Sequence, residues 1–274
     1  MIRRQHRRGI LPATLAILAG AGLFTGASAA EPLITGTANY AIAMTAKGTA
    51  TDGGMSGDMT YALKRECDAY RIEASLDLTI AGPAGDMPMK MRSILIERET
   101  ALDFDLSGDL GGMIIEKAKG TATKTDAGLA IAVTEPAAKT WNVPGPVLFP
   151  VAMVEEAIRV AEAGGTFAEH KVFDGSGNGE EVWTMSLVIT PVAETADLGE
   201  EALFATGLGF EDLDRWRMKF SYFKPGAGDQ MPAFATEAIV YANGFALATT
   251  YDLGPVALHL QLIDFTPEAP KPCT

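Results

Sequence analysis

The sequence predicts an all-β protein in which about a dozen or more antiparallel strands accompany a single amphipathic helix. Three observations support this fold class. Apolar and polar residues alternate in segment after segment, turn-forming Gly, Pro, Asp or Asn separate these segments at short intervals, and only one stretch has helical periodicity. Alternation with a period of two is typical of strands with one buried face, and closely spaced turns are typical of β-sandwiches and barrels.

The first thirty residues have the pattern of a secretory signal peptide. Four arginines within the first eight residues precede a short apolar run, and small residues lead up to Ala30. This order predicts export and cleavage near Ala30, because the apolar run is too short and too rich in Gly and Ala to anchor the chain in a bilayer. We therefore expect residues 31–274 to form one domain in the periplasm, with no transmembrane segment after cleavage.

The chain is acidic, with a formal net charge of −13, and loss of the four leader arginines takes it to about −17. Such a charge gives no electrostatic attraction for nucleic acid or for anionic lipid headgroups. Binding to nucleic acid is therefore not expected, and solubility is the simplest reason for the charge.

The alternation locates the strands along the mature chain. In the clearest segment, RWRMKFSY, the apolar side chains of Trp216, Met218 and Phe220 face one way and the intervening basic residues face the other. The same alternation predicts strands around residues 75–80, 102–106, 183–189 and 258–262. Between two such runs, Asn243-Gly244 predicts a type I′ hairpin turn, because both residues readily adopt positive φ.

Residues 150–163 break this rule and predict the one amphipathic helix. Its apolar residues cover about half of a helical wheel, and glutamates and one arginine occupy the rest. Pro150 suits the first helical turn, and Gly164-Gly165 suits the end of the helix. A helix of this kind in a β protein either packs against the sheet or forms a lid over an apolar cleft.

Motifs that would indicate catalysis or a cofactor are absent from the sequence. No nucleophile elbow, zinc-protease pair or phosphate-binding loop occurs, and His170 and His259 lack neighbours at metal-ligand spacing. Asp174, Ser176 and Asn178 match the first positions of a calcium loop, but the position that needs a bidentate Glu holds Met185. We therefore expect no enzyme activity, no cofactor and no metal site, and interpret DGSGNG as a tight turn.

An alternating methionine stripe, Met87, Met89 and Met91, has three possible interpretations. It fits ordinary strand core, an adaptable apolar binding surface, or soft thioether ligands for copper(I). The candidate binding surface combines this stripe with the apolar face of the helix, and its residues are Met87, Met89, Met91, Val151, Val154 and Ile158.

The two cysteines, Cys67 and Cys273, predict a disulfide, since an exported protein meets an oxidising compartment and neither cysteine has metal-ligand neighbours. The bond would tie the C-terminal tail to an early strand, and we expect it to bring the two ends of the sheet together and cover exposed edges.

Taken together, several segments resemble the EipB family, a former domain of unknown function whose members are periplasmic cell-envelope integrity proteins. The segments are the signal peptide, Leu148-Phe149-Pro150 with the helix after it, Val172-Phe173-Asp174-Gly175, Asn243-Gly244 and the placement of Cys67 and Cys273. The likeness covers essentially the whole mature chain. It implies a long antiparallel β-spiral, or broken barrel, with one helix and one disulfide between the two cysteines.

The resemblance also implies a non-catalytic role in cell-envelope integrity, with a periplasmic tetratricopeptide-repeat protein as partner. The first functional hypothesis is therefore a scaffold or adaptor that works through protein partners. The second is a carrier that shelters a lipid or acyl chain in an apolar cleft of the broken barrel, and it follows from the methionine stripe and the apolar helix face.

Overall fold

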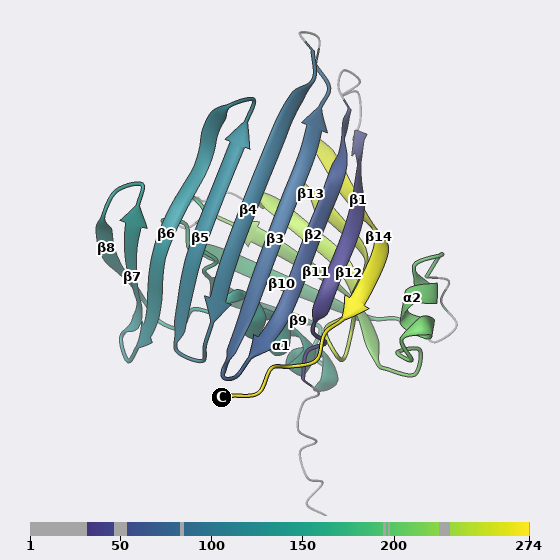
Figure 1. Cartoon of the computed structure of the whole chain (residues 1–274). Helices are drawn as coiled ribbons and strands as arrows, with labels where there is room; N and C mark the ends of the chain where they lie inside the picture. The colour runs from purple at the N-terminus through teal and green to yellow at the C-terminus, as the bar shows by residue number, and fades with distance from the viewer. Residues whose placement is uncertain are drawn as a thin grey trace, which may run out of the picture. The chain divides into compact units, whose positions relative to one another are not determined.

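Among the residues that it describes, the computed structural model contains fourteen strands in one sheet and two helices (Figure 1). The described residues are 32–46, 54–82, 85–193, 196, 198–224 and 231–273, and the predicted signal peptide, residues 1–30, lies outside them. The elements are β1 (Gly36–Ala46), β2 (Met55–Glu66), β3 (Ala69–Ile80), β4 (Met87–Glu97), β5 (Ala101–Leu110), β6 (Met113–Thr125), β7 (Gly128–Glu135), β8 (Lys139–Pro144), α1 (Pro150–Glu162), β9 (Phe167–Val172), β10 (Trp183–Pro191), α2 (Ala202–Gly207), β11 (Arg215–Phe223), β12 (Phe234–Tyr241), β13 (Ala246–Asp252) and β14 (Val256–Pro267).

The strands follow one another as a continuous antiparallel meander. Their order across the sheet is β8-β7-β6-β5-β4-β3-β2-β1-β14-β13-β12-β11-β10-β9, so β1 pairs with β14 in the middle of the sheet. Figure 1 shows β9–β12 crossing behind β2–β6, and the two edge strands, β8 and β9, do not pair with each other. This arrangement confirms the predicted all-β class and the unclosed barrel-like sheet.

The main hydrophobic core lies between the two halves of this sheet and includes buried side chains from β3–β7, β9–β12 and α1. The rings of Phe104 in β5 and Phe173 after β9 meet edge to face, with their centroids 5.5 Å apart. A Cβ on Gly175 would lie 2.8 Å from the Phe104 ring, and this glycine has a φ of +83°. Only glycine therefore suits this position, where the DGSGNG turn packs against the opposite half of the sheet.

The N-terminus of α1 is capped by Glu97, at the end of the distant strand β4. The Glu97 carboxylate accepts hydrogen bonds from the backbone N–H groups of Val151, at 2.7 Å, and Ala152, at 2.9 Å. Pro150 has no N–H to satisfy, and Phe149 in the N-cap position offers no polar side chain. A carboxylate is well suited to this position because the N-terminal end of a helix carries partial positive charge.

The second helix, α2, is absent from the sequence-based prediction. Ala205 of α2 packs with Tyr241, Phe245 and Leu247 in a separate hydrophobic cluster. The carboxylate of Glu201, just before the helix, accepts hydrogen bonds from two backbone N–H groups of β13 and β14. None of the helices within the described part of the chain has the length and hydropathy needed to cross a membrane.

The turn at Asn243-Gly244 is not type I′, which corrects the prediction. Gly244 has a φ of +80°, but Asn243 is not in the positive region. Instead, the Asn243 side-chain oxygen accepts the N–H of Phe245 at 3.0 Å. Because this hydrogen bond stabilises the turn, only Gly244 adopts the left-handed conformation, and Asn243 does not.

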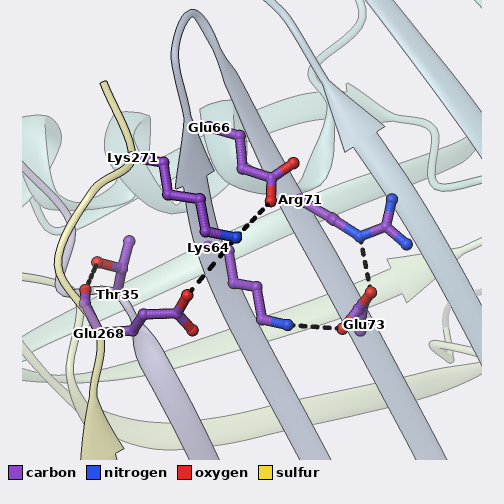
Figure 2. A network of polar contacts seen from close by, with 7 residues as sticks. All are labelled: Thr35, Lys64, Glu66, Arg71, Glu73, Glu268 and Lys271. Atoms are coloured by element: carbon purple, nitrogen blue, oxygen red, sulfur yellow. Dashed lines mark hydrogen bonds and ion pairs between the residues drawn. The ribbon is translucent and has the colours of Figure 1, made fainter. Parts of the chain in front are cut away.

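A disulfide joins Cys67, in the turn between β2 and β3, to Cys273 in the C-terminal tail. The backbone of Lys271 pairs with this turn through Arg65 and Cys67. Figure 2 shows the Lys271 ammonium group beside the carboxylate of Glu66, at 3.1 Å. The tail therefore runs along the ends of the central strands β1 and β2. The expected closure of the sheet's two ends is wrong, because those ends are β8 and β9.

Candidate apolar ligand site

The inner face of the sheet contains an apolar cleft with a volume of about 480 Å³. Its walls come from β1–β5 and from β13 and β14 with the turn between them. The lining residues are Ile42, Met55, Met59, Ala74, Leu76, Leu78, Met89, Met91, Arg92, Ser93, Leu106, Tyr251, Leu253, Leu258 and Leu260. The volume falls in the range of about 300–1,000 Å³ that is typical of small-molecule sites, which are also mainly apolar.

The alternation of β3 and β4 builds one wall of the cleft. Leu76 lies directly opposite Met91, and Leu78 lies directly opposite Met89, so that four apolar side chains share one face of the sheet. Methionine side chains are unbranched and polarizable, and can therefore adjust to ligands of irregular shape. The wall suits a flexible hydrocarbon chain better than a rigid polar molecule.

Few polar groups line the cleft, and they differ in whether they are free to form a hydrogen bond with a ligand. The Arg92 guanidinium donates hydrogen bonds to the Asp77 carboxylate, at 2.8 Å, and to backbone carbonyls of Leu76 and Met91. Burial raises the pKa of the Tyr251 hydroxyl above its ordinary value of 10, so the group is a hydrogen-bond donor well beyond neutral pH. Tyr251 can donate a hydrogen bond to a neutral carbonyl group of a ligand that enters the cleft.

The structure divides the predicted binding surface between the two ends of β4. Met89 and Met91 line the cleft, and Met87 is exposed beside it. Val151 and Ile158 of α1 are buried in the main core, and Val154 lines a second cavity of about 120 Å³. Because Glu97 contacts the start of α1, the helix lies about ten strand residues, or roughly 30 Å, from Met87.

The residues that resemble a calcium loop form hydrogen bonds within the protein. The Asp174 carboxylate accepts the N–H of Ser176, and the Ser176 hydroxyl accepts the indole N–H of Trp183. The Asn178 side-chain oxygen accepts the N–H of Lys117 in β6. Within the described ranges, no group of three or more His, Cys, Asp or Glu side chains is placed to hold a metal ion.

Glu97 is the buried titratable side chain that sequence reasoning missed. Its side chain is only 5% exposed, and burial raises its pKa to about 7, although the two N–H donors of α1 and the Lys124 ammonium oppose this shift. The signal was present in the sequence, since Glu97 continues the inward-facing register of Met89, Met91 and Leu95. A carboxylate in the apolar register of a strand indicates a buried polar contact.

Comparisons with known proteins agree on the fold. The family model described as EipB-like matches residues 27–268. A curated relative from Brucella abortus, named cell envelope integrity protein EipB, is 25% identical over 156 residues. That match spans 55% of this chain and only 52% of the relative.

A crystal structure from Brucella abortus, described as a beta-barrel-like protein of domain of unknown function DUF1849, is also similar. It aligns with a TM-score of 0.78 and 21% identity, and the alignment covers 88% of this chain and all of that one. At this level of identity the likeness supports the fold alone.

Proposed function

Because the chain belongs to the EipB-like family, we propose that it supports the integrity of the cell envelope by sheltering an acyl chain in its apolar cleft. The observation that carries this proposal is the cleft itself, whose walls are mainly aliphatic and methionine side chains from six strands, β1–β5 and β14. An acyl chain that leaves a membrane exposes apolar surface to water, at a cost of about 0.8 kcal/mol per CH₂ group. A cleft of this volume covers much of such a chain.

The proposed ligand has a neutral polar group next to its acyl chain. Tyr251 supplies a hydrogen-bond donor in the cleft, and the protein as a whole is strongly acidic. A neutral ester or amide carbonyl can accept from the tyrosine without the repulsion that a carboxylate would meet. The proposed location is the periplasm, where the Cys67–Cys273 disulfide is stable.

A scaffold that acts through a tetratricopeptide-repeat partner is the competing proposal. It explains a role in the envelope equally well, but it assigns no purpose to the cleft. Native mass spectrometry after mild extraction from cells separates the two proposals. A co-purifying lipid mass supports the carrier, whereas a clean protein mass together with a co-eluting repeat protein supports the scaffold.

Met91→Trp is the variant that tests the cleft directly. Met91 lies between Leu76 of β3 and Gly108 of β5, so the larger ring fills cleft space there, and we expect the lipid-bound fraction in native mass spectra to fall by about tenfold. Ile94→Trp is the matched control, because Ile94 lies on the same strand with its side chain exposed on the opposite face. This control should retain wild-type occupancy and a wild-type melting curve.

Equal occupancy in the wild type, Met91→Trp and Ile94→Trp would place the lipid elsewhere and contradict the proposal. A melting curve for each variant under non-reducing conditions separates the loss of the ligand from the loss of the fold. A variant with Met91 replaced by Leu keeps the cleft apolar and open, and should bind lipid as the wild type does.

A further inference from the structure

The apolar side chains that the protein exposes are concentrated at one end of the sheet. Six of the eleven large apolar side chains that are exposed among the described residues lie in the terminal residues of strands at this end or in the segments next to them. They form what we call the apolar rim, and its members are Met87, Met113, Ile114, Ile115, Met231 and Leu253. Met113, Ile114 and Met231 are the most accessible, at 63%, 74% and 76% exposed.

The backbone pairing shows that these residues share one end. The pairs at this end can be followed across the sheet from β13 to β6. On one side, Asp252 of β13 pairs with Ala257 of β14, which pairs with Thr45 of β1. On the other, Met55 of β2 pairs with Ile80 of β3, Ile80 with Met87 of β4, and Leu110 of β5 with Met113 of β6. The ends of β3, β4, β5 and β6 that carry these residues are at the upper side of Figure 1. Met231 lies just before β12, whose Ala235 pairs with Asp252.

The cleft reaches this same end of the sheet. Leu253 belongs to both features, since it lines the cleft and its side chain is 40% exposed. Met87 of the rim is two residues from Met89 of the cleft wall, and Leu110 pairs with both Met89 and Met113. The apolar rim and the apolar cleft therefore form one continuous surface.

We propose that the apolar rim docks the protein on a zwitterionic lipid surface, from which an acyl chain enters the cleft. The inference rests on the proposed function and adds the source of the ligand. Methionine and isoleucine side chains at the ends of these strands can insert among lipid headgroups, and binding scales with the apolar area that they bury. A lipid surface also supplies the hydrocarbon that the adjoining cleft accepts.

The charge around the rim selects the kind of lipid surface. Asp86 directly precedes β4, Asp109 and Asp252 lie at the ends of β5 and β13 that carry the rim, and the chain as a whole has a net charge of −13. These carboxylates repel anionic headgroups and leave a neutral surface as the favoured partner. The proposal therefore predicts weaker binding when anionic lipid is added, which is the opposite of most peripheral membrane proteins.

Flotation with phosphatidylcholine vesicles tests this inference. We expect the wild-type protein with its disulfide formed to float with the vesicles, and the double variant Met113→Ser and Ile114→Ser to float about tenfold less. Val188→Ser is the matched control, since Val188 is 49% exposed on β10, outside the rim. It should float as the wild type does, and replacing a third of the lipid by phosphatidylglycerol should reduce flotation of the wild type.

Binding of a fluorescent fatty acyl ester in solution distinguishes the rim from the cleft. The rim double variant should retain this binding, whereas Met91→Trp should lose it and still float with vesicles. A wild type that does not float, or a rim variant that floats equally well, would overturn the docking proposal while leaving the cleft proposal intact. If both variants bind the ester as the wild type does, the proposed function is overturned instead.

Discussion

Replacing Cys273 by serine is expected to lower the free energy of unfolding by about 2–5 kcal/mol. The disulfide joins residues 206 positions apart, and such a long closed loop removes much of the conformational entropy of the unfolded chain. For a chain of this size the melting temperature should fall by roughly 5–15 °C. Thermal unfolding followed by circular dichroism under non-reducing conditions measures the shift.

Position 273 is the cleaner site for this test. Cys67 lies in the tight turn between β2 and β3, where its N–H also donates to the carbonyl of Lys271, whereas Cys273 lies in the exposed tail. Wild-type protein treated with a reductant should match Cys273→Ser, and adding Cys67→Ser to that variant should have little further effect. Identical melting curves for the oxidised wild type and Cys273→Ser would contradict a stabilising bond.

Replacing Glu97 by alanine is expected to destabilise the protein by about 2–4 kcal/mol at neutral pH. The substitution leaves the N–H groups of Val151 and Ala152 without their acceptor at the start of α1. Each unsatisfied buried donor costs about 1–3 kcal/mol, and the small alanine also leaves a void. Urea denaturation measures the loss, and hydrogen exchange should locate the earliest opening in the first turn of α1.

The stability of the wild type should also depend on the protonation of Glu97. Its pKa in the folded protein is about 7, above the ordinary value of 4.5, so the folded state holds this proton more tightly than the unfolded state. The stabilisation that protonated Glu97 gives the folded state is therefore fully present below about pH 4.5. It declines by about 3 kcal/mol in total as the pH rises through 7. The charged groups that act on Glu97 are Lys124, which lowers its pKa, and Glu155, which raises it.

Glu97→Gln isolates this effect from other titrations. The amide oxygen still accepts one hydrogen bond from α1, but the side chain cannot ionise, so stability should change less between pH 5 and pH 8 than in the wild type. The difference between the two proteins at each pH measures the contribution of Glu97. A difference that does not vary over this range would show that Glu97 does not titrate there.

The strands could be predicted from the sequence because each buries one face. In β10 and β11 the residues that alternate in the sequence also alternate in burial, with Met185, Leu187 and Met218 inside. The predicted helix at residues 150–163 corresponds closely to α1, for which the sequence provides Pro150 at the start and a glycine pair at the end. Local patterns suffice where local geometry decides the structure.

The cleft could be predicted only in part, because its walls are assembled from distant segments. The methionine stripe and the apolar face of α1 are both real features, but β4 separates them by its whole length, and no local pattern specifies that distance. The rest of the cleft comes from strands at opposite ends of the chain, such as β1 and β14, which become neighbours only through the order of the sheet. The short helix α2 was missed for a similar reason, since its Ala205 is stabilised by packing on a cluster from β12 and β13.

Photo-crosslinking with a diazirine-bearing acyl ester, followed by peptide mass spectrometry, is the most direct test of the acyl-chain cleft. The account predicts that the label attaches to peptides containing Leu76, Met89 and Leu258, and that Met91→Trp removes it while Ile94→Trp does not. Labels spread over the outer face of the sheet, and unchanged by Met91→Trp, would contradict it.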